Sequence, residues 1–186
     1  MHSPEPGTDA PSDATIVRAV LRGDVEAFAH LVDRHHARCL RVATHLLADS
    51  DDAEDAVQDA FLRAYRHLGS YSERDRFGSW LLRIVVNQCR SRAMREARYV
   101  PFVTEQHENN SESSATNDAV DRRAELEHAL GQLGPEQREA VVLRFAEELS
   151  YEEISALTGV GVSALKMRVK RACTRLHCLL TAHLHT

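Results

Sequence analysis

Cationic side chains near the C-terminus occur at a spacing that would let one helix bind phosphate groups. From Gly161 to the last residue the chain carries no Asp or Glu. Apolar residues recur at i, i+4, i+7 and i+11 from Leu165 to Leu176, which predicts one apolar helix face. Such a helix could neutralise phosphates and reach base edges in a major groove, which is recognition rather than covalent chemistry. The opposite face would carry Lys166, Met167, Lys170, Arg171 and Thr174.

Two helices joined by a tight turn would hold this basic face in place. Ser150, followed three residues later by Glu153, has the sequence pattern of a capping box at a helix start. Gly159 can adopt the left-handed conformation that ends this helix, and Ser163 is placed to cap the next one. Residues 147–176 therefore predict a helix-turn-helix. A solvated basic face on an ordinary surface helix is the alternative, and the capped partner helix favours DNA binding.

A second charged segment, residues 48–68, carries acids in its first half and bases only in its second half. Acids in a first turn stabilise the helix dipole, which accounts for some of them without any partner. The acidic-then-basic order predicts a docking surface for a protein partner, with the purely structural role as the alternative. The charged face would carry Asp52, Asp55, Asp59, Arg63 and Arg66.

Aromatic residues lie in a segment that interrupts the helical pattern, and a basic helix follows. Serines, charges and a glycine in residues 70–78 predict an ordered loop, and helix resumes over about residues 79–97. Rings beside guanidinium groups suit single-stranded nucleic acid, because bases stack on rings while cations hold the backbone. Core packing is the alternative for Phe77 and Trp80, and it is favoured for Trp80.

Composition is typical of an intracellular globular protein. The chain has 186 residues, 43% of them apolar, which is enough for a core, and no apolar run approaches the roughly 20 residues that span a bilayer. The polar N-terminus does not resemble a signal peptide, so we expect a cytoplasmic protein without membrane insertion. The net charge of −5 averages over segregated charges. No Ser-His-Asp, paired-carboxylate or phosphate-loop constellation is present, so we expect no enzyme activity and no cofactor.

Cysteine and histidine usage gives little support to a metal site. The four cysteines lack CxxC spacing, so we expect reduced thiols. The adjacent His35 and His36 would point in different directions on a helix, and we expect solvated imidazoles. One C-terminal group is a candidate for Zn²⁺ or copper, with Cys173 packed near the core and solvated histidines as the favoured alternative. Its residues are Cys173, His177, Cys178, His183 and His185.

The succession of helical patterns predicts an all-α fold of two small helical domains joined by a flexible linker. The linker is polar and carries no apolar periodicity. The predicted divisions are a disordered tail 1–12, a first domain 13–98, a linker 99–121, a second domain 122–180 with the helix-turn-helix, and a tail 181–186.

Start and stop signals also predict the first two helices. Ser12 or Asp13 would cap a short helix that ends at Gly23. Asp24 would cap the next helix, which runs to about residue 48 with Val25 among its inward-facing residues.

Four segments together resemble signatures of the extracytoplasmic-function (ECF) sigma factors, the small two-domain specificity subunits of bacterial RNA polymerase. They are DDAEDAVQDAFLRAYRHL, FGSWLLRIVVNQCRSR, LGPEQREAVVLRFAEELSYEEISALTG and VSALKMRVKRA, and they occur in family order. The resemblance covers residues 24–97, which match family region 2, and residues 133–176, which match region 4. It implies a protein that binds core polymerase and directs promoter recognition and transcription initiation.

The resemblance assigns roles to three groups of residues. It implies that the β′ clamp helices of polymerase bind Asp52, Asp55, Gln58, Asp59 and Phe61. It implies that the non-template strand of the −10 element is bound by Ser70, Tyr71, Ser72, Phe77, Arg83, Asn87 and Arg90. The implied −35 contacts are Ser163, Lys166, Met167, Lys170, Arg171 and Thr174. Met167 cannot donate a hydrogen bond to a base edge, which leaves the −35 sequence open.

The implied partners are core polymerase, through its β′ clamp helices and β subunit, promoter DNA and an anti-sigma factor. A free-standing dimeric helix-turn-helix regulator that binds a palindrome is the alternative function. It would need a dimer surface or an effector pocket in the first domain, whereas the acidic helix and the aromatic loop favour the sigma factor.

Overall fold

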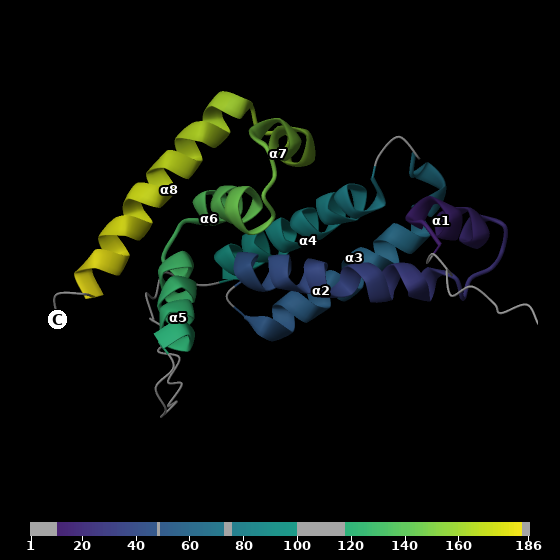
Figure 1. Ribbon diagram of the computed structural model, residues 1–186, viewed down its shortest axis with the longest axis horizontal. Helices are drawn as coiled ribbons and strands as arrows, with labels where there is room; N and C mark the ends of the chain where they lie inside the picture. The colour runs from purple at the N-terminus through teal and green to yellow at the C-terminus, as the bar shows by residue number, and fades with distance from the viewer. Residues whose placement is uncertain (1–10, 48, 73–75, 100–117, 184–186) are drawn as a thin grey trace, which may run out of the picture.

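The computed structural model describes residues 11–47, 49–72, 76–99 and 118–183. Every regular element in these ranges is helical, which confirms the all-α prediction (Figure 1). Within the same ranges, no helix combines the length and the apolar character needed to cross a membrane. The elements are α1 (Asp13–Leu21), α2 (Phe28–Leu46), α3 (Ser50–Arg66), η1 (Leu68–Ser70), α4 (Phe77–Tyr99), α5 (Asp118–Gly131), α6 (Pro135–Val141), η2 (Val142–Ala146), α7 (Tyr151–Thr158) and α8 (Val162–His183).

Helices extend into the segments predicted as linker and tail. α4 continues to Tyr99 and α5 begins at Asp118, so both ends of the predicted linker 99–121 are helical. α8 continues to His183, inside the predicted tail 181–186. Arginine, glutamate and leucine are good helix formers, so a helix can continue where its apolar periodicity has ended. Pro11 and Ser12 at the end of the predicted tail 1–12 are described, and the remaining parts of the predicted tails and linker lie outside the described residues, at 1–10, 100–117 and 184–186.

Polar side chains fix where the first helices begin. The Ser12 hydroxyl accepts a hydrogen bond from the backbone three residues on, which confirms Ser12 as the cap of α1. The Asp24 carboxylate accepts one from the Ala27 amide, but this stabilises a turn, and α2 begins only at Phe28. The prediction that Asp24 starts the helix is therefore wrong. Val25 lies in the turn, 56% exposed, and not on an inward face.

Helices α1 to α4 pack around one apolar core in which α3 is central. Ala56, Ala60 and Ala64 of α3 are fully buried. Such small side chains let α2 and α4 approach α3 closely on either side. The opposite face of α3 is left for charged residues, as the sequence predicted.

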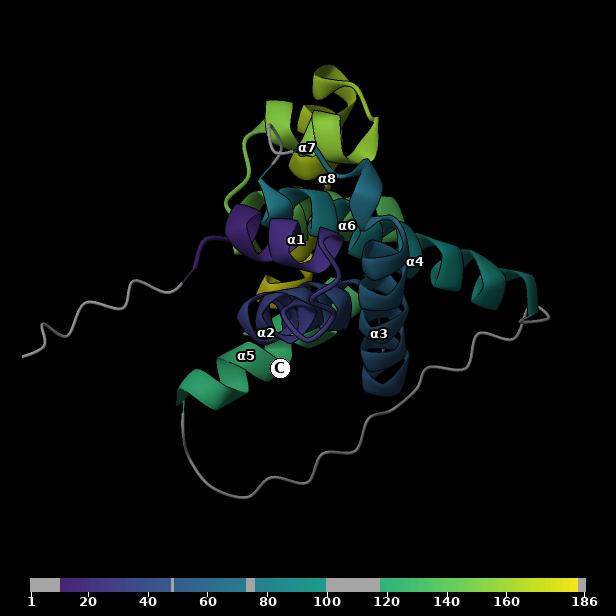
Figure 2. The same cartoon turned by 90° about the vertical axis from the view of Figure 1, so that its right-hand side faces the viewer.

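The N-terminal and C-terminal halves share a second apolar core. Val42 of α2 and Leu82 and Val86 of α4 form one cluster with Val142 of η2 and Ile154 of α7, and none of the five exceeds 2% exposure. Figures 1 and 2 show α6 and α7 lying against the layer that contains α2 and α4. Burial of an aliphatic side chain contributes about 1.5–3 kcal/mol to the free energy of folding. The shared core therefore holds the two halves together.

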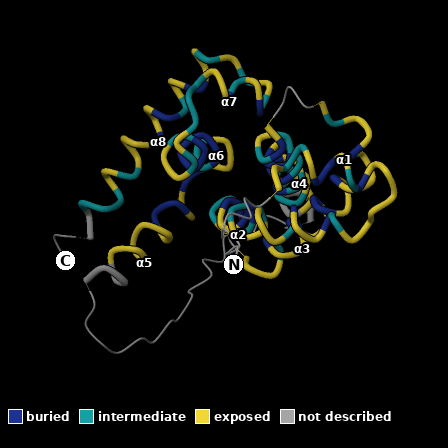
Figure 3. The backbone as a smooth tube through the Cα atoms, turned by 45° about the vertical axis from the view of Figure 1, so that its right-hand side comes forward, coloured by how far each residue is buried: buried dark blue, intermediate teal, exposed yellow. Residues whose placement is uncertain are grey.

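Helix α8 packs with its inner face on α5, α6 and α7. The apolar cluster at this contact contains Ala172 of α8 together with Leu130, Leu133 and Val141. Figure 3 shows buried and exposed positions alternating along α8, with the exposed ones facing away from the protein. The outward face of α8 is therefore open to a ligand.

Candidate nucleic-acid interface

The outward face of α8 carries the residues that the sequence predicted as DNA contacts. Lys166, Met167, Lys170, Arg171 and Thr174 are all exposed, and Leu165 and Ala172 on the inner face are at most 1% exposed. The Lys166 ammonium lies 5.7 Å from the centre of the Tyr151 ring, a cation–π contact that orients it beside the turn. A rigid, apolar-backed helix thus presents three cations and a thioether on one side.

Helix α7 and a glycine turn hold α8 in position. The Ser150 hydroxyl accepts from the Glu153 amide at 3.1 Å, and the Glu153 carboxylate accepts from the Ser150 amide at 2.8 Å, which confirms the capping box. The Ser150 amide and the Ser150 hydroxyl, the latter also at 2.8 Å, donate to the Glu153 carboxylate, and these two hydrogen bonds lower the pKa of Glu153. Gly159 has φ 74°, which confirms the left-handed end of α7. Ser163 does not cap α8, because α8 already begins at Val162 and Ser163 lies in its first turn, exposed.

The acidic part of α3 is tied to α4 by a single arginine. Arg92 of α4 lies 3.0 Å from an Asp52 oxygen, 3.5 Å from an Asp55 oxygen and 3.1 Å from an Asp59 oxygen. The Asp55 and Asp59 side chains are still 64% and 54% exposed, and Gln58 between them is exposed too. The three carboxylates thus form an ordered, accessible edge, which we call the acidic edge, Asp52, Asp55 and Asp59.

Phe61 does not belong to this edge. It is 6% exposed and packs in the core, where its ring stacks on His36 at 6.2 Å. Its neighbour in the core, Phe28, meets it edge-on at 6.5 Å. Phe61 therefore supports α3 from inside and cannot contact a partner directly.

The aromatic residues of the predicted loop pack against one another. Phe77, Tyr71 and Trp80 form a triangle with ring centres 5.5–5.7 Å apart. Phe77 is 2% exposed and is the first residue of α4, two residues before the predicted helix start. Tyr71 and Trp80 are half-buried, so core packing of Trp80 is confirmed and Phe77 has no free ring face. Ser70 and Ser72 are exposed, while residues 73–75 lie outside the described part of the chain.

His35 is part of this cluster and is not a solvated imidazole as predicted. Its ring lies 5.3 Å from Phe77, and its Nε2 is 2.9 Å from an Asp13 carboxylate oxygen. Packing against a core ring removes most of its water, and the carboxylate of α1 supplies the hydrogen-bond partner. His36 is exposed, as expected.

Two arginines predicted to face the −10 strand instead bind the C-terminal half. Arg90 forms a paired contact with Glu139 at 2.5 and 2.6 Å, and this hydrogen bonding raises the pKa of Arg90. Arg83 donates to the Ala156 carbonyl at 2.9 Å, at the negative end of the α7 dipole. Asn87, between them in sequence, remains exposed.

Buried carboxylates on the C-terminal half were missed by sequence reasoning. Glu139 is 5% exposed, and the Glu147 side chain, 2% exposed, pairs with Arg38 and Arg41 of α2 at 2.5 and 3.3 Å. Glu139 stands three residues before Val142, so helical periodicity places it on the apolar face. The position of Glu139 on the apolar face was the sequence feature from which its burial could have been predicted.

The C-terminal cysteine and histidine group shows no assembled site. Cys173, His177 and Cys178 are all exposed on α8, so the expected packing of Cys173 near the core is wrong, and Ala172 fills that place. Within the described ranges, no three His, Cys, Asp or Glu side chains are grouped to hold a metal ion. The side chain of His183 and the whole of His185 lie outside the description. Burial raises the pKa of Cys39 and of Cys89 to about 12, which keeps both thiols protonated.

Comparison with known proteins assigns both halves to one family. Residues 31–99 match the family model of Sigma-70 region 2, and residues 123–176 match that of Sigma-70, region 4. The chain is 37% identical to the ECF RNA polymerase sigma factor SigM of Mycobacterium tuberculosis over 169 residues, which are 91% of this chain and 85% of SigM. It is 36% identical to the RNA polymerase sigma factor CarQ of Myxococcus xanthus over 160 residues, 85% of this chain and 91% of CarQ.

Solved structures agree with this assignment. CnrH in complex with the cytosolic domain of CnrY superposes with a TM-score of 0.68 at 27% identity, covering 92% of this chain and 99% of that one. The sigma factor RpoE in complex with the anti-sigma factor NepR from Bartonella quintana gives 0.67 at 27% identity, covering 83% and 96%. The chain belongs to the ECF family of RNA polymerase sigma factors.

Proposed function

We propose that this sigma factor binds core RNA polymerase through the acidic edge of α3 and brings it to promoters by binding DNA with both halves. The observation that carries the proposal is the exposed cationic face of α8 on a capped helix-turn-helix. The proposed division is a polymerase-binding and −10-binding domain over residues 13–98 and a −35-binding domain over 122–180. The protein contributes binding, and polymerase supplies the catalysis.

In the proposed complex, the acidic edge and exposed Gln58 contact the β′ clamp helices. Carboxylates in a fixed row are suited to cationic side chains of a protein partner, because complementary charges accelerate association and set orientation. Phe61 stabilises α3 by packing in the core and makes no contact with polymerase. The relatives solved with anti-sigma factors support an anti-sigma factor as a further partner of this chain.

For the −10 element, we propose that the non-template strand meets Ser70, Tyr71, Ser72 and Asn87, which are exposed or half-exposed. A melted base can enter beside Tyr71, and the unstacking cost of a few kcal/mol is offset by these contacts. Arg83 and Arg90 reach the strand only after they release the C-terminal half.

For the −35 element, we propose that α8 enters the major groove with Ser163, Lys166, Met167, Lys170, Arg171 and Thr174 toward DNA. The Met167 thioether has no hydrogen to donate, so at its position an apolar contact, for example with a thymine methyl group, replaces hydrogen-bond readout.

The proposal is tested by incubating the purified full chain with core RNA polymerase and recovering polymerase with bound promoter fragments. We expect the chain to co-purify with polymerase and to direct transcription from the recovered fragments. If the chain does not bind polymerase but binds palindromic duplex DNA as a dimer, it is instead a free-standing regulator.

Substitutions on α8 test the −35 assignment. Arg171→Ala and Lys170→Ala should each weaken binding to the recovered promoter duplex, measured by fluorescence anisotropy over a salt series. A base-edge contact should cost about 1–3 kcal/mol and relax preference at one position, whereas a phosphate contact should reduce the salt slope by about one. Arg123→Ala on α5 is the control, and unchanged binding in both α8 variants would show that α8 is misassigned.

A further inference from the structure

Helix α1 lies before residue 31, where the match to Sigma-70 region 2 begins, and none of the proposed contacts uses it. It is nevertheless attached to the segment that is proposed to meet the −10 strand. α1 packs on η1, and Tyr71 follows η1 directly. Figure 1 shows α1 at the same end of the molecule as the start of α4. α1 is therefore placed to influence this segment.

One carboxylate connects α1 to two consecutive residues of α2. The Asp13 carboxylate accepts a hydrogen bond from Nη1 of Arg34 at 2.5 Å and one from Nε2 of His35 at 2.9 Å. Because a carboxylate can only accept, Nε2 of His35 carries a proton, and the bond orients the imidazole ring. The His35 side chain is 13% exposed and the Arg34 side chain 35%. The contact with His35 is therefore the more buried of the two.

The His35 ring in turn contacts the aromatic triangle and the first turn of α4. Its centre lies 5.3 Å from that of Phe77, whose ring contacts Tyr71 and Trp80. A methyl group added at Gly78 would stand 3.2 Å from Cε1 of His35 and 3.5 Å from its Nδ1. Such close packing leaves the ring little room to move. A displacement of His35 would therefore also displace Phe77 and the start of α4.

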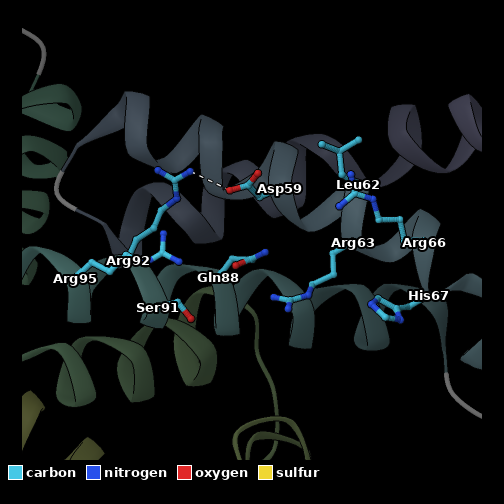
Figure 4. Close-up of a pocket in the computed structure, with 9 residues that line it drawn as sticks. All are labelled: Asp59, Leu62, Arg63, Arg66, His67, Gln88, Ser91, Arg92 and Arg95. Atoms are coloured by element: carbon cyan, nitrogen blue, oxygen red, sulfur yellow. Dashed lines mark hydrogen bonds and ion pairs between the residues drawn. The ribbon is translucent and has the colours of Figure 1, made fainter.

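The short helix η1 gives a second connection between α1 and Tyr71. The Tyr71 amide donates to the carbonyl of Leu68 at 3.1 Å, and Leu68 is 2% exposed in the core. η1 contacts both α1 and α3. Figure 4 shows His67, which directly precedes η1, at one end of a groove between α3 and α4 that Arg63 and Arg95 also line. Tyr71 is thus held by η1 and by the aromatic triangle, and both are in contact with residues that α1 holds.

We propose that α1 is a positioning element for −10 recognition, in which the hydrogen bond between Asp13 and His35 holds the aromatic triangle, and hence Tyr71, in the orientation that a melted base meets. The inference rests on the proposed function, because it requires Tyr71 at the strand. Asp13 and His35 are positioning residues that act through the triangle. In a packed network of this kind, changing a residue that does not touch the ligand alters affinity by roughly 2- to 30-fold.

The test uses holoenzyme assembled from the full chain and core polymerase. Fluorescence anisotropy measures its affinity for the labelled non-template strand of a promoter fragment recovered with polymerase, and for a scrambled strand of the same composition. Asp13→Ala should lower the ratio of these two affinities roughly 2- to 30-fold. Gly78→Ala, which displaces the His35 ring from the side of α4, should lower the ratio as well. The salt dependence of binding should stay unchanged in both variants, because neither removes a cation.

Two control variants separate positioning from general support of the fold. Arg34→Gln removes the more exposed contact of Asp13 and leaves the hydrogen bond to His35, so the ratio should not change. Asp13→Asn keeps an oxygen that can accept from His35, and it should also retain the ratio. Trp80 is the sole tryptophan of the chain and reports on the triangle without polymerase or DNA. Its emission should shift in Asp13→Ala and in Gly78→Ala, and in neither control.

An unchanged ratio in Asp13→Ala or Gly78→Ala, or an equal fall in Arg34→Gln, would overturn the proposal. An equal loss of affinity for both strands would overturn it too, because that result indicates general destabilisation. The same holds if the ratio falls without a shift of Trp80 emission, since the triangle would not have moved. If the wild-type holoenzyme does not distinguish the two strands, the proposed −10 role fails and this inference with it. If the wild-type holoenzyme distinguishes them and the variants do so equally well, this inference alone fails.

Discussion

Reversing the charge of Asp55 and Asp59 together, by Asp55→Lys and Asp59→Lys, is expected to abolish binding to core RNA polymerase. Both carboxylates are more than half exposed on one edge of α3, so they are available to a cationic partner surface. Placing like charges opposite each other at an interface costs several kcal/mol, enough to lower affinity beyond detection. Binding is measured by co-purification with core enzyme and by competition with the wild-type chain.

The fold should survive this change. Exposed ion pairs contribute roughly 0–1 kcal/mol, so the loss of two pairs to Arg92 leaves the helices intact, which circular dichroism and thermal unfolding will show. The matched control is Asp51→Lys with Glu54→Lys, which makes the same charge change on exposed positions of the same helix outside the acidic edge. Retained affinity in the first variant, or equal loss in the control, would remove α3 as the specific polymerase contact.

Local features of the fold could be read from the sequence because they depend on neighbouring residues. The capping box at Ser150, the left-handed Gly159 and the apolar stripe from Leu165 are determined within one or two helical turns. The same reasoning failed at Asp24, where a capping side chain stabilises a turn instead of a helix, because the two uses of Asp share one sequence pattern.

Contacts between distant segments could not be predicted. Arg90 and Glu139 are 49 residues apart, and neither one alone indicates its partner. For the same reason, the burial of Phe77 beneath Tyr71 and the convergence of Arg63 and Arg95 in one groove follow only from the packing of α4 on its neighbours. Residue types identified which chemistry was available, and tertiary packing determined which side chains were free to use it.

Arg90 lies between the two halves, and its removal should destabilise the folded arrangement. Its guanidinium is the ionic partner of Glu139, whose side chain is only 7% exposed, and it also donates to the Thr158 carbonyl at 3.3 Å. Arg90→Ala leaves the carboxylate buried without a counter-charge. Removing one partner of a charged hydrogen bond costs about 1.5–3 kcal/mol. The cost stays below the 3–5 kcal/mol of a fully buried pair because the Arg90 side chain is 34% exposed.

We therefore expect Arg90→Ala to lower the free energy of unfolding in urea by about 1.5–3 kcal/mol, while Arg95→Ala on the same helix, which has no such partner, changes it little. Replacing both partners, by Arg90→Met with Glu139→Met, should recover most of the loss, because no charge is then left unpaired at the interface. If the double variant is as unstable as Arg90→Ala, packing and not the unpaired carboxylate is the cause. If Arg90→Ala costs no more than Arg95→Ala, the ion pair does not hold the two halves together, and Arg90 is free to meet the −10 strand without any separation of the halves.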